Sequence, residues 1–144
     1  MRYVLDTDHV SLLQRGHPQV VAHLARVDLA SRAVTVVTVA AQVQGRLAII
    51  RRATAEAAAA RAFERLQETI AFYLAVKVLP YDAAAVTLFE QLRQQRIRIG
   101  TQDLRIATIA LSSDAILVTR NSRDFRQVPG LNIVDWSEPA QASL

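Results

Sequence analysis

The chain has 144 residues, of which 51% are hydrophobic, with four Gly, four Pro and no Cys. The lack of Cys excludes disulfides and thiolate metal sites, and the composition excludes a disordered or fibrous chain. The formal net charge is +4 and Lys77 is the only lysine, so nearly all cations are arginines, which suit phosphate contacts but equally suit ion-paired helix faces.

Hydrophobic periodicity and capping residues predict strands that alternate with helices. In chain order these are strand 2–5, helix 9–14, a helix from Pro18, strand 34–37, helix 38–52 capped by Thr38, helix 55–73, strand 77–79, a helix from the cap Asp82 to about Arg96, helix 101–111, strand 115–118 and strand 132–134. The tail from Ser137 is expected to be loose. This alternation predicts the α/β class: a three-layer α/β/α sandwich with a central parallel sheet.

Nothing in the sequence calls for a linker, so we expect a single domain over residues 1–144. No basic and apolar leader precedes the first strand, and no apolar run has the length of a membrane span. A cytoplasmic protein is therefore expected.

Residues 100–125 are the most informative stretch. Thr101 is expected to cap a helix, which places Asp103 in the first turn, where free backbone N–H groups favour a carboxylate. The helix is apolar on nearly every side from Leu104 to Leu111, as is typical of a helix packed on more than one face. The next strand ends at Thr119, and open α/β sheets bind ligands at such strand ends.

Three carboxylates follow strands or begin helices in remote parts of the sequence: Asp6, Asp103 and Asp124. We predict that they meet at one edge of the sheet. Oxygen ligands without Cys suit Mg²⁺ or Mn²⁺, which polarise phosphates and activate water. Each Asp could equally be a cap or a loop residue. The three histidines lack the spacing of metal ligands and are expected on the surface: His9, His17 and His23.

Four segments together resemble the PIN-domain ribonucleases, in particular the VapC toxins of bacterial toxin–antitoxin pairs. They are MRYVLDTDHVSLL, TVVTVAAQVQGRLAIIRR, RIRIGTQDLRIATIAL and ILVTRNSRDFRQVPGLNIVDW. The resemblance spans nearly the whole chain, with residues 53–77 being generic helix. Single pieces such as LDTD are weak signals, whereas four pieces in this order are a specific one.

The resemblance implies that Asp6 and Asp103 bind one or two Mg²⁺ or Mn²⁺ ions. It places Asp124, the third expected catalytic residue and metal ligand, in the last acidic motif, with Asn121 where other PIN domains often have Asp. Two further residues have supporting roles: Thr119 would orient a ligand or phosphate, and Asp8 would assist the ligands. The implied reaction is in-line attack of water on an RNA phosphodiester, leaving 5′-phosphate and 3′-hydroxyl ends. The implied partners are a cognate antitoxin and a second copy of the chain in a homodimer.

The sequence departs from the family at one position. The helix after the second strand normally carries an acidic residue four positions before a glycine, in a pattern such as VEEQxxG, and here Ala41 stands at that position before Gly45. Gln42 is one helical step away, about 100° around the axis, and has no charge. Losing even a residue that supports a metal ligand typically costs 10–100-fold in affinity or activity, so we expect a weakened or inactive enzyme.

Two other interpretations remain. The segment from Val4 to Val10 also resembles the first motif of haloacid-dehalogenase-type phosphotransferases, in which Asp6 would be the nucleophile, but Lys77 is a poor match to their downstream lysine. A dinucleotide-binding fold is excluded because Gly-x-Gly-x-x-Gly is absent. The second is non-enzymatic: with Ala41 in place, the protein would bind its antitoxin and have a regulatory role without cleaving RNA.

Overall fold

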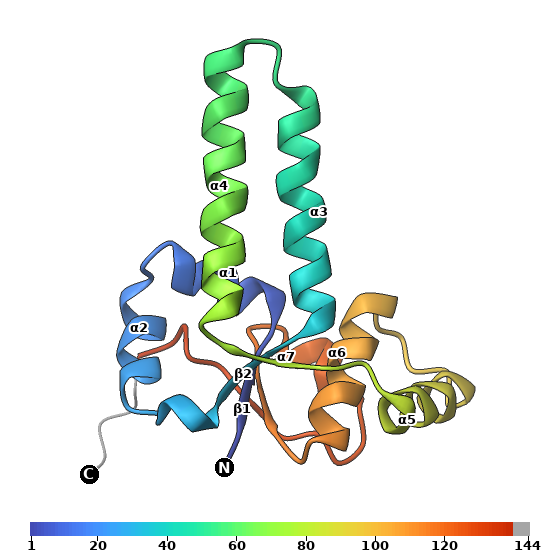
Figure 1. The fold of residues 1–144 in the computed structure, drawn as a ribbon. Coiled ribbons are helices and arrows are strands. Elements are labelled where there is room, and N and C mark those ends of the chain that lie inside the picture. Colours follow the sequence, from blue (N-terminus) through green and yellow to red (C-terminus); the bar gives the residue numbers. More distant parts are fainter. Residues whose placement is uncertain (140–144) are drawn as a thin grey trace.

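The computed structural model describes residues 1–139 and contains a central sheet with helices on both faces (Figure 1). In chain order the elements are β1 (Tyr3–Leu5), α1 (Thr7–Gln14), α2 (Pro18–Ala25), the 3₁₀ helix η1 (Leu29–Ser31), β2 (Arg32–Thr35), α3 (Val36–Arg52), α4 (Glu56–Leu74), β3 (Lys77–Leu79), α5 (Ala83–Gln94), α6 (Thr101–Ser112), β4 (Ile116–Val118), α7 (Ser122–Phe125) and β5 (Ile133–Val134). None of the helices in these residues combines the length and hydropathy needed to cross a bilayer.

The five strands are all parallel and lie in the order β3-β2-β1-β4-β5. Strand β1 occupies the centre, where Tyr3 pairs with Arg32 of β2 on one side and with Ile116 of β4 on the other. The carboxyl ends of β1 and β4 therefore lie side by side, although more than a hundred residues separate them in the sequence. The predicted parallel sheet is confirmed.

Alternating side chains of the central strands feed two separate cores. Val4 and Leu117 face the layer of α5 and α6, whereas Leu5 and Val118 face the layer of α1 and α2. Successive residues of a strand point to opposite faces, so a continuous apolar run is what a strand covered on both sides requires. The three-layer sandwich predicted from the sequence is confirmed by these two cores.

Helices α3 and α4 form an antiparallel arm that extends well beyond the sheet (Figure 1). At the base of the arm, the side chain of Gln42 is buried in a polar network. Its Oε1 accepts hydrogen bonds from the hydroxyl of Tyr73 at 2.6 Å and from the amide of Gln14 at 3.0 Å. Its Nε2 donates to the Gln14 Oε1 and, at 3.4 Å, to the Ser11 hydroxyl. Gln42 thus ties the arm to α1.

Several predicted boundaries are wrong by a few residues. The second strand ends at Thr35, not residue 37, because the Thr35 hydroxyl accepts the backbone N–H of Thr38 and so begins α3 two residues earlier than predicted. Helix α6 is preceded by Gly100 as N-cap, and Thr101 is its first helical residue. The short helix α7, capped by Asn121, was not predicted. Of the tail predicted to be loose, residues 140–144 lie outside the described residues.

Candidate active site

A polar cavity of about 630 Å³ opens where β1 and β4 end. Its walls come from the turn into α1, the first turn of α6 and the segment after β4. The polar residues that line it include Asp6, Asp8, Ser11, Asp103, Arg120 and Asn121. The cavity thus occupies the place where parallel α/β sheets bind their ligands.

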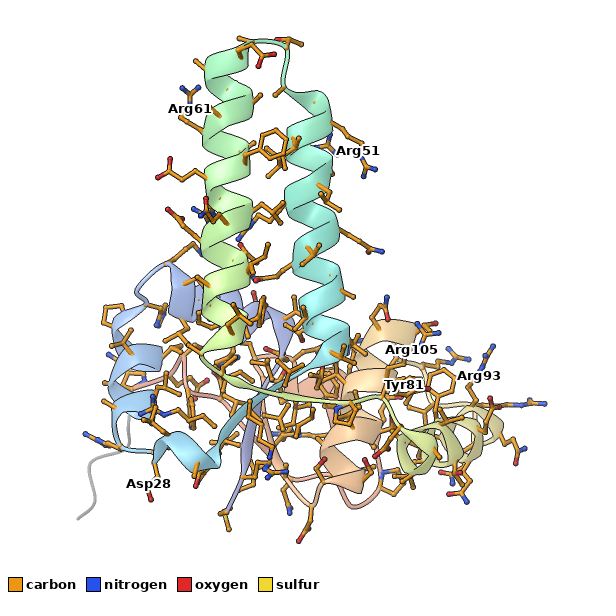
Figure 2. The ribbon with its side chains drawn as sticks, in the orientation of Figure 1. Asp28, Arg51, Arg61, Tyr81, Arg93 and Arg105 are labelled. Carbon is orange, nitrogen blue, oxygen red and sulfur yellow. The ribbon has the colours of Figure 1, made fainter. Side chains whose placement is uncertain are left out.

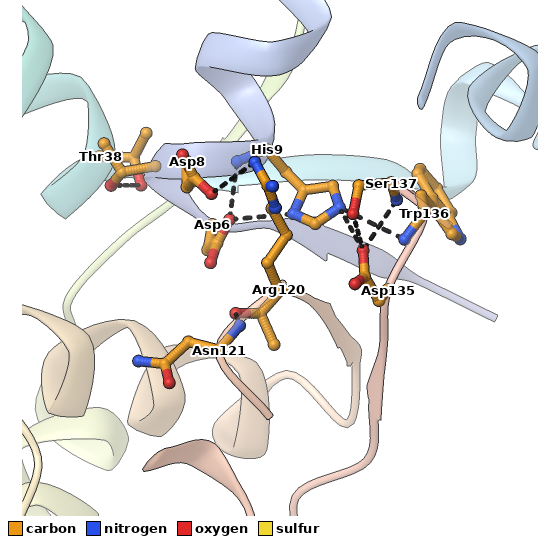
Figure 3. Close-up of polar contacts among 11 residues, drawn as sticks. Asp6, Asp8, His9, Thr38, Arg120, Asn121, Asp135, Trp136 and Ser137 are labelled. Carbon is orange, nitrogen blue, oxygen red and sulfur yellow. Dashed lines mark hydrogen bonds and ion pairs between the residues drawn. The ribbon is translucent and has the colours of Figure 1, made fainter. Parts of the chain in front are cut away.

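Asp6 lies on the floor of this cavity and is 6% exposed. It is the N-cap of α1, and its Oδ1 accepts the backbone N–H of His9 at 2.8 Å. The same oxygen lies 3.3 Å from the Nδ1 of the His9 ring (Figure 3). Capping explains why a carboxylate is stable here, and it fixes the direction of the Asp6 side chain.

Asp103 reaches the cavity from the first turn of α6. Burial, and then the negative charges of Asp6 and Asp124, raise the pKa of Asp103 above its ordinary value. Carboxylates that repel one another in this way are close in space. The structure thus places Asp6 and Asp103 in one cavity, and Asp124, whose charge also acts on Asp103, does not itself line that cavity.

This raised pKa predicts how the metal-free protein responds to pH. Between the unfolded value of 3.8 and the raised pKa of Asp103, the native state binds more protons than the unfolded state, so stability falls as pH rises across that window. In EDTA at pH 7 we expect Asp103→Asn to melt at a higher temperature than the unaltered protein. The difference should narrow as pH falls toward 4. Calorimetry over this range checks it, and a constant difference would contradict the prediction.

The segment after β4 holds Asp124 through a chain of hydrogen bonds. The hydroxyl of Thr119, which is almost fully buried, accepts the backbone N–H of Asn121 at 3.0 Å. The amide of Asn121 donates to Asp124 Oδ2 at 2.9 Å, and its Oδ1 accepts the backbone N–H of Asp124. Thr119 and Asn121 therefore act as supports, with Asn121 also lining the cavity.

Asp8 stands at the mouth of the cavity opposite Arg120 (Figure 3). The Arg120 guanidinium lies 3.8 Å from Asp8 Oδ2, and both side chains are about half exposed. An exposed pair at this distance contributes little to stability. Arg120 is thus free to exchange Asp8 for another anion such as a phosphate.

Comparison with known proteins identifies the family. The family model described as "PIN domain" matches residues 3–131. The chain belongs to the PIN-domain family. It is 30% identical to "Ribonuclease VapC1" of Haemophilus influenzae over 142 residues, which cover 96% of this chain and all of the relative.

Two further matches agree with this assignment. The first, "tRNA(fMet)-specific endonuclease VapC" of Shigella flexneri, is 43% identical over 70 residues, so the chain spans only about half (53%) of that relative's length. The second, a solved structure of VapBC-1 from nontypeable Haemophilus influenzae, superposes with a TM-score of 0.68 at 27% identity. That match covers 96% of this chain and 100% of the other.

Ala41, where the family resemblance predicts an acid, is half-buried and does not line the cavity. It is the sixth residue of α3 and lies in the second turn, whereas a helix capped by Thr38 would have placed it in the first turn. Thr38, one turn earlier on the same face, lies 3.0 Å from the Thr7 hydroxyl at the cavity wall. Neighbouring Gln42 is occupied by the arm network described above, so it supplies no substitute ligand.

The prediction that the histidines lie on the surface is wrong. His9 is fully buried beside Asp6, and His23 and His17 are partly buried, with His23 stacked on Trp136 and His17 capping α2. Once Asp6 is recognised as the N-cap, His9 is the third residue of the helix, and a side chain at that position can face back toward the cap. The contact with Trp136 carries no such signal, because it joins residues 127 apart.

The side chains present fit a hard divalent cation. Mg²⁺ is commonly bound through one or two carboxylates while it keeps several waters. Asp6 and Asp103 line a cavity with room for the ion and its waters. The raised pKa of Asp103 reflects its burial first and then the negative charges of Asp6 and Asp124, which a cation would neutralise. Within residues 1–139, no three His, Asp or Glu side chains are grouped closely enough to form a complete metal site by themselves.

Proposed function

We propose that this PIN-domain protein is the toxin of a VapBC-type toxin–antitoxin pair and is a divalent-metal-dependent endoribonuclease. The observation that carries the proposal is the cavity shared by Asp6 and Asp103 at the ends of two neighbouring strands, in a chain similar over nearly its full length to a ribonuclease VapC1. Asp6 and Asp103 bind Mg²⁺ or Mn²⁺, and Asp124 adds negative charge from behind Asn121.

Each residue then has a task in the hydrolysis of an RNA phosphodiester. A divalent cation, when bound, supplies Lewis-acid chemistry and a water of lowered pKa. Thr119 and Asn121 hold the last acidic segment, and Arg120 at the mouth offers a guanidinium to a substrate phosphate. Asp8 pairs only weakly with Arg120, so a substrate phosphate can replace it. Charge–phosphate contacts of this kind position RNA without selecting its sequence.

The proposal extends to the partners and the compartment. A cognate antitoxin binds the toxin and covers the acidic cavity, and the toxin works as a homodimer in the cytoplasm, where its RNA substrates are. The proposal of an antitoxin partner is supported by the similarity of this chain, in fold and sequence, to the solved VapBC-1 structure.

Cleavage of a labelled structured RNA tests this function. We expect cleavage in Mn²⁺ and none in EDTA, with 5′-phosphate ends on the products. The rate should be low because no acid stands at position 41.

Because Ala41 leaves the metal site short of a ligand, a regulatory module that binds antitoxin without cleaving RNA is the second candidate. Tight antitoxin binding with no cleavage in Mn²⁺ would favour that candidate.

A further inference from the structure

The ring of His9 is enclosed between the metal-site carboxylate and the C-terminal segment of the chain. It has no exposed surface. On one side its Nδ1 lies 3.3 Å from Asp6 Oδ1, and on the other its Nε2 lies 3.3 Å from the backbone nitrogen of Trp136 (Figure 3). A fully buried imidazole with a polar partner on each nitrogen is held in one orientation.

The partner on the Nε2 side determines which nitrogen carries the proton. The backbone N–H of Trp136 can only donate, and Trp136 is 3% exposed, so it needs an acceptor inside the protein. No other acceptor for this N–H exists among the described residues. Nε2 must therefore be unprotonated, and the neutral ring carries its hydrogen on Nδ1.

Asp135 is the competing partner on the Nε2 side. Its Oδ1 lies 3.4 Å from Nε2, and a carboxylate there would favour a proton on that nitrogen. However, the same oxygen already accepts the hydroxyl of Ser137 at 2.6 Å and the backbone N–H of Ser137 at 2.8 Å. These shorter hydrogen bonds satisfy Asp135, which leaves Nε2 to Trp136.

We propose that His9 is a positioning residue, whose Nδ1–H holds Oδ1 of Asp6 and thereby directs Oδ2 into the cavity for metal binding. This inference rests on the metal-dependent function proposed above. Both donors of His9, the ring Nδ1–H and the backbone N–H, converge on Oδ1, and no hydrogen bond from the described residues occupies Oδ2. Hydrogen-bonded partners that fix a metal ligand typically contribute 10–100-fold to metal affinity.

The geometry also gives the segment after β5 a role in the site. Trp136 packs on the ring of Tyr3, with centroids 5.2 Å apart, and stacks on His23. It is therefore fixed against β1 independently of His9. Through Nε2, this fixed segment sets the tautomer and the orientation of His9, and so the position of Asp6. The C-terminal segment thus supports the metal site without contacting it.

Two substitutions separate the two sides of the ring. His9→Asn keeps an N–H near the position of Nδ1 but is too short to reach Trp136, whereas His9→Gln places an oxygen near Nε2 and removes the donor to Asp6. We expect both variants to melt at lower temperature in EDTA. In Mn²⁺ titrations, His9→Asn should stay within a few-fold of the unaltered protein, and His9→Gln should lose about 10–100-fold in affinity. His17→Asn, which preserves the N-cap of α2, is the matched control.

The tautomer is measured separately, from the ¹⁵N shifts of the imidazole in the metal-free protein. A hydrogen on Nδ1 is expected. A hydrogen on Nε2, or Mn²⁺ affinities that fall equally in the two variants, would overturn the role of His9. If the loss of Mn²⁺ affinity in each variant simply matched its loss of melting temperature, the role would also be overturned, because that pattern indicates a residue that only stabilises the fold. If the unaltered protein bound no Mn²⁺ while His9 carried its hydrogen on Nδ1, the metal-dependent function would fail, and the role of His9 in metal binding with it.

Discussion

Replacing Asp103 by Asn is expected to reduce metal-dependent RNA cleavage by at least about 100-fold, because a direct ligand should matter more than a supporting partner. The amide keeps the size of the side chain but removes the charge that would bind the cation. The stabilisation of the protein by Mn²⁺ should disappear along with cleavage, since a ligand raises the melting temperature only if the native state binds it. Initial rates on labelled RNA and melting curves with and without Mn²⁺ measure both effects.

The matched control is Asp28→Asn. Asp28 is an exposed carboxylate at the start of η1, ahead of β2; it does not line the cavity, and its side chain makes no capping hydrogen bond (Figure 2). Removing it changes the net charge of the protein by the same amount as Asp103→Asn. We expect cleavage to change less than two-fold in this control. Equal losses in both variants would mean that overall charge, and not a metal ligand, governs the rate.

The second large effect is a gain. Ala41→Glu should tighten Mn²⁺ binding and raise RNA cleavage by at least roughly tenfold, because it adds the carboxylate that the family resemblance predicts at this position. Ala41 lies on the same face of α3 as Thr38, whose hydroxyl contacts the cavity wall, and α3 contacts α6, the helix that carries Asp103. In EDTA the same variant should melt at lower temperature, because a further negative charge joins those of Asp6 and Asp103.

Ala40→Glu is the control for this gain. It introduces the same charge one residue earlier on the exposed side of α3, about 100° around the helix. This variant should bind Mn²⁺ and cleave RNA like the unaltered protein. If neither Glu variant gains affinity or activity, the site has changed at more than one position, and the antitoxin-binding module becomes the better account.

The layers of the fold could be predicted because their signals are local. Continuous apolar runs such as Ile116–Val118 identify strands covered on both faces, and Pro18 or Asp82 marks the start of a helix. The boundary at Thr35 could not be placed in this way. β-branched residues continue through Val37 and favour a longer strand, and only the hydrogen bond from Thr38 to the Thr35 hydroxyl decides that the helix begins there.

The acids of the site were identified from their places at strand and helix ends, and topology brings Asp6 and Asp103 to one cavity. The burial of His9 could not be predicted from its spacing to other histidines. It depends on Trp136, which follows β5 at the edge of the sheet and donates its backbone N–H to His9. Arg120 was likewise not singled out, because an arginine in a loop has no pattern until the cavity beside it is known.

The central place of β1 in the sheet also governs when the cavity can form during synthesis of the chain. Tyr3 of β1 pairs with Ile116 of β4, and His9, which contacts Asp6, also accepts a hydrogen bond from the backbone of Trp136. Domains generally fold during or after translation as their contacts become available, and parallel strands this far apart in sequence pair late. A nascent chain on the ribosome therefore carries Asp6 from the start, but it has no assembled cavity until nearly the whole chain has emerged.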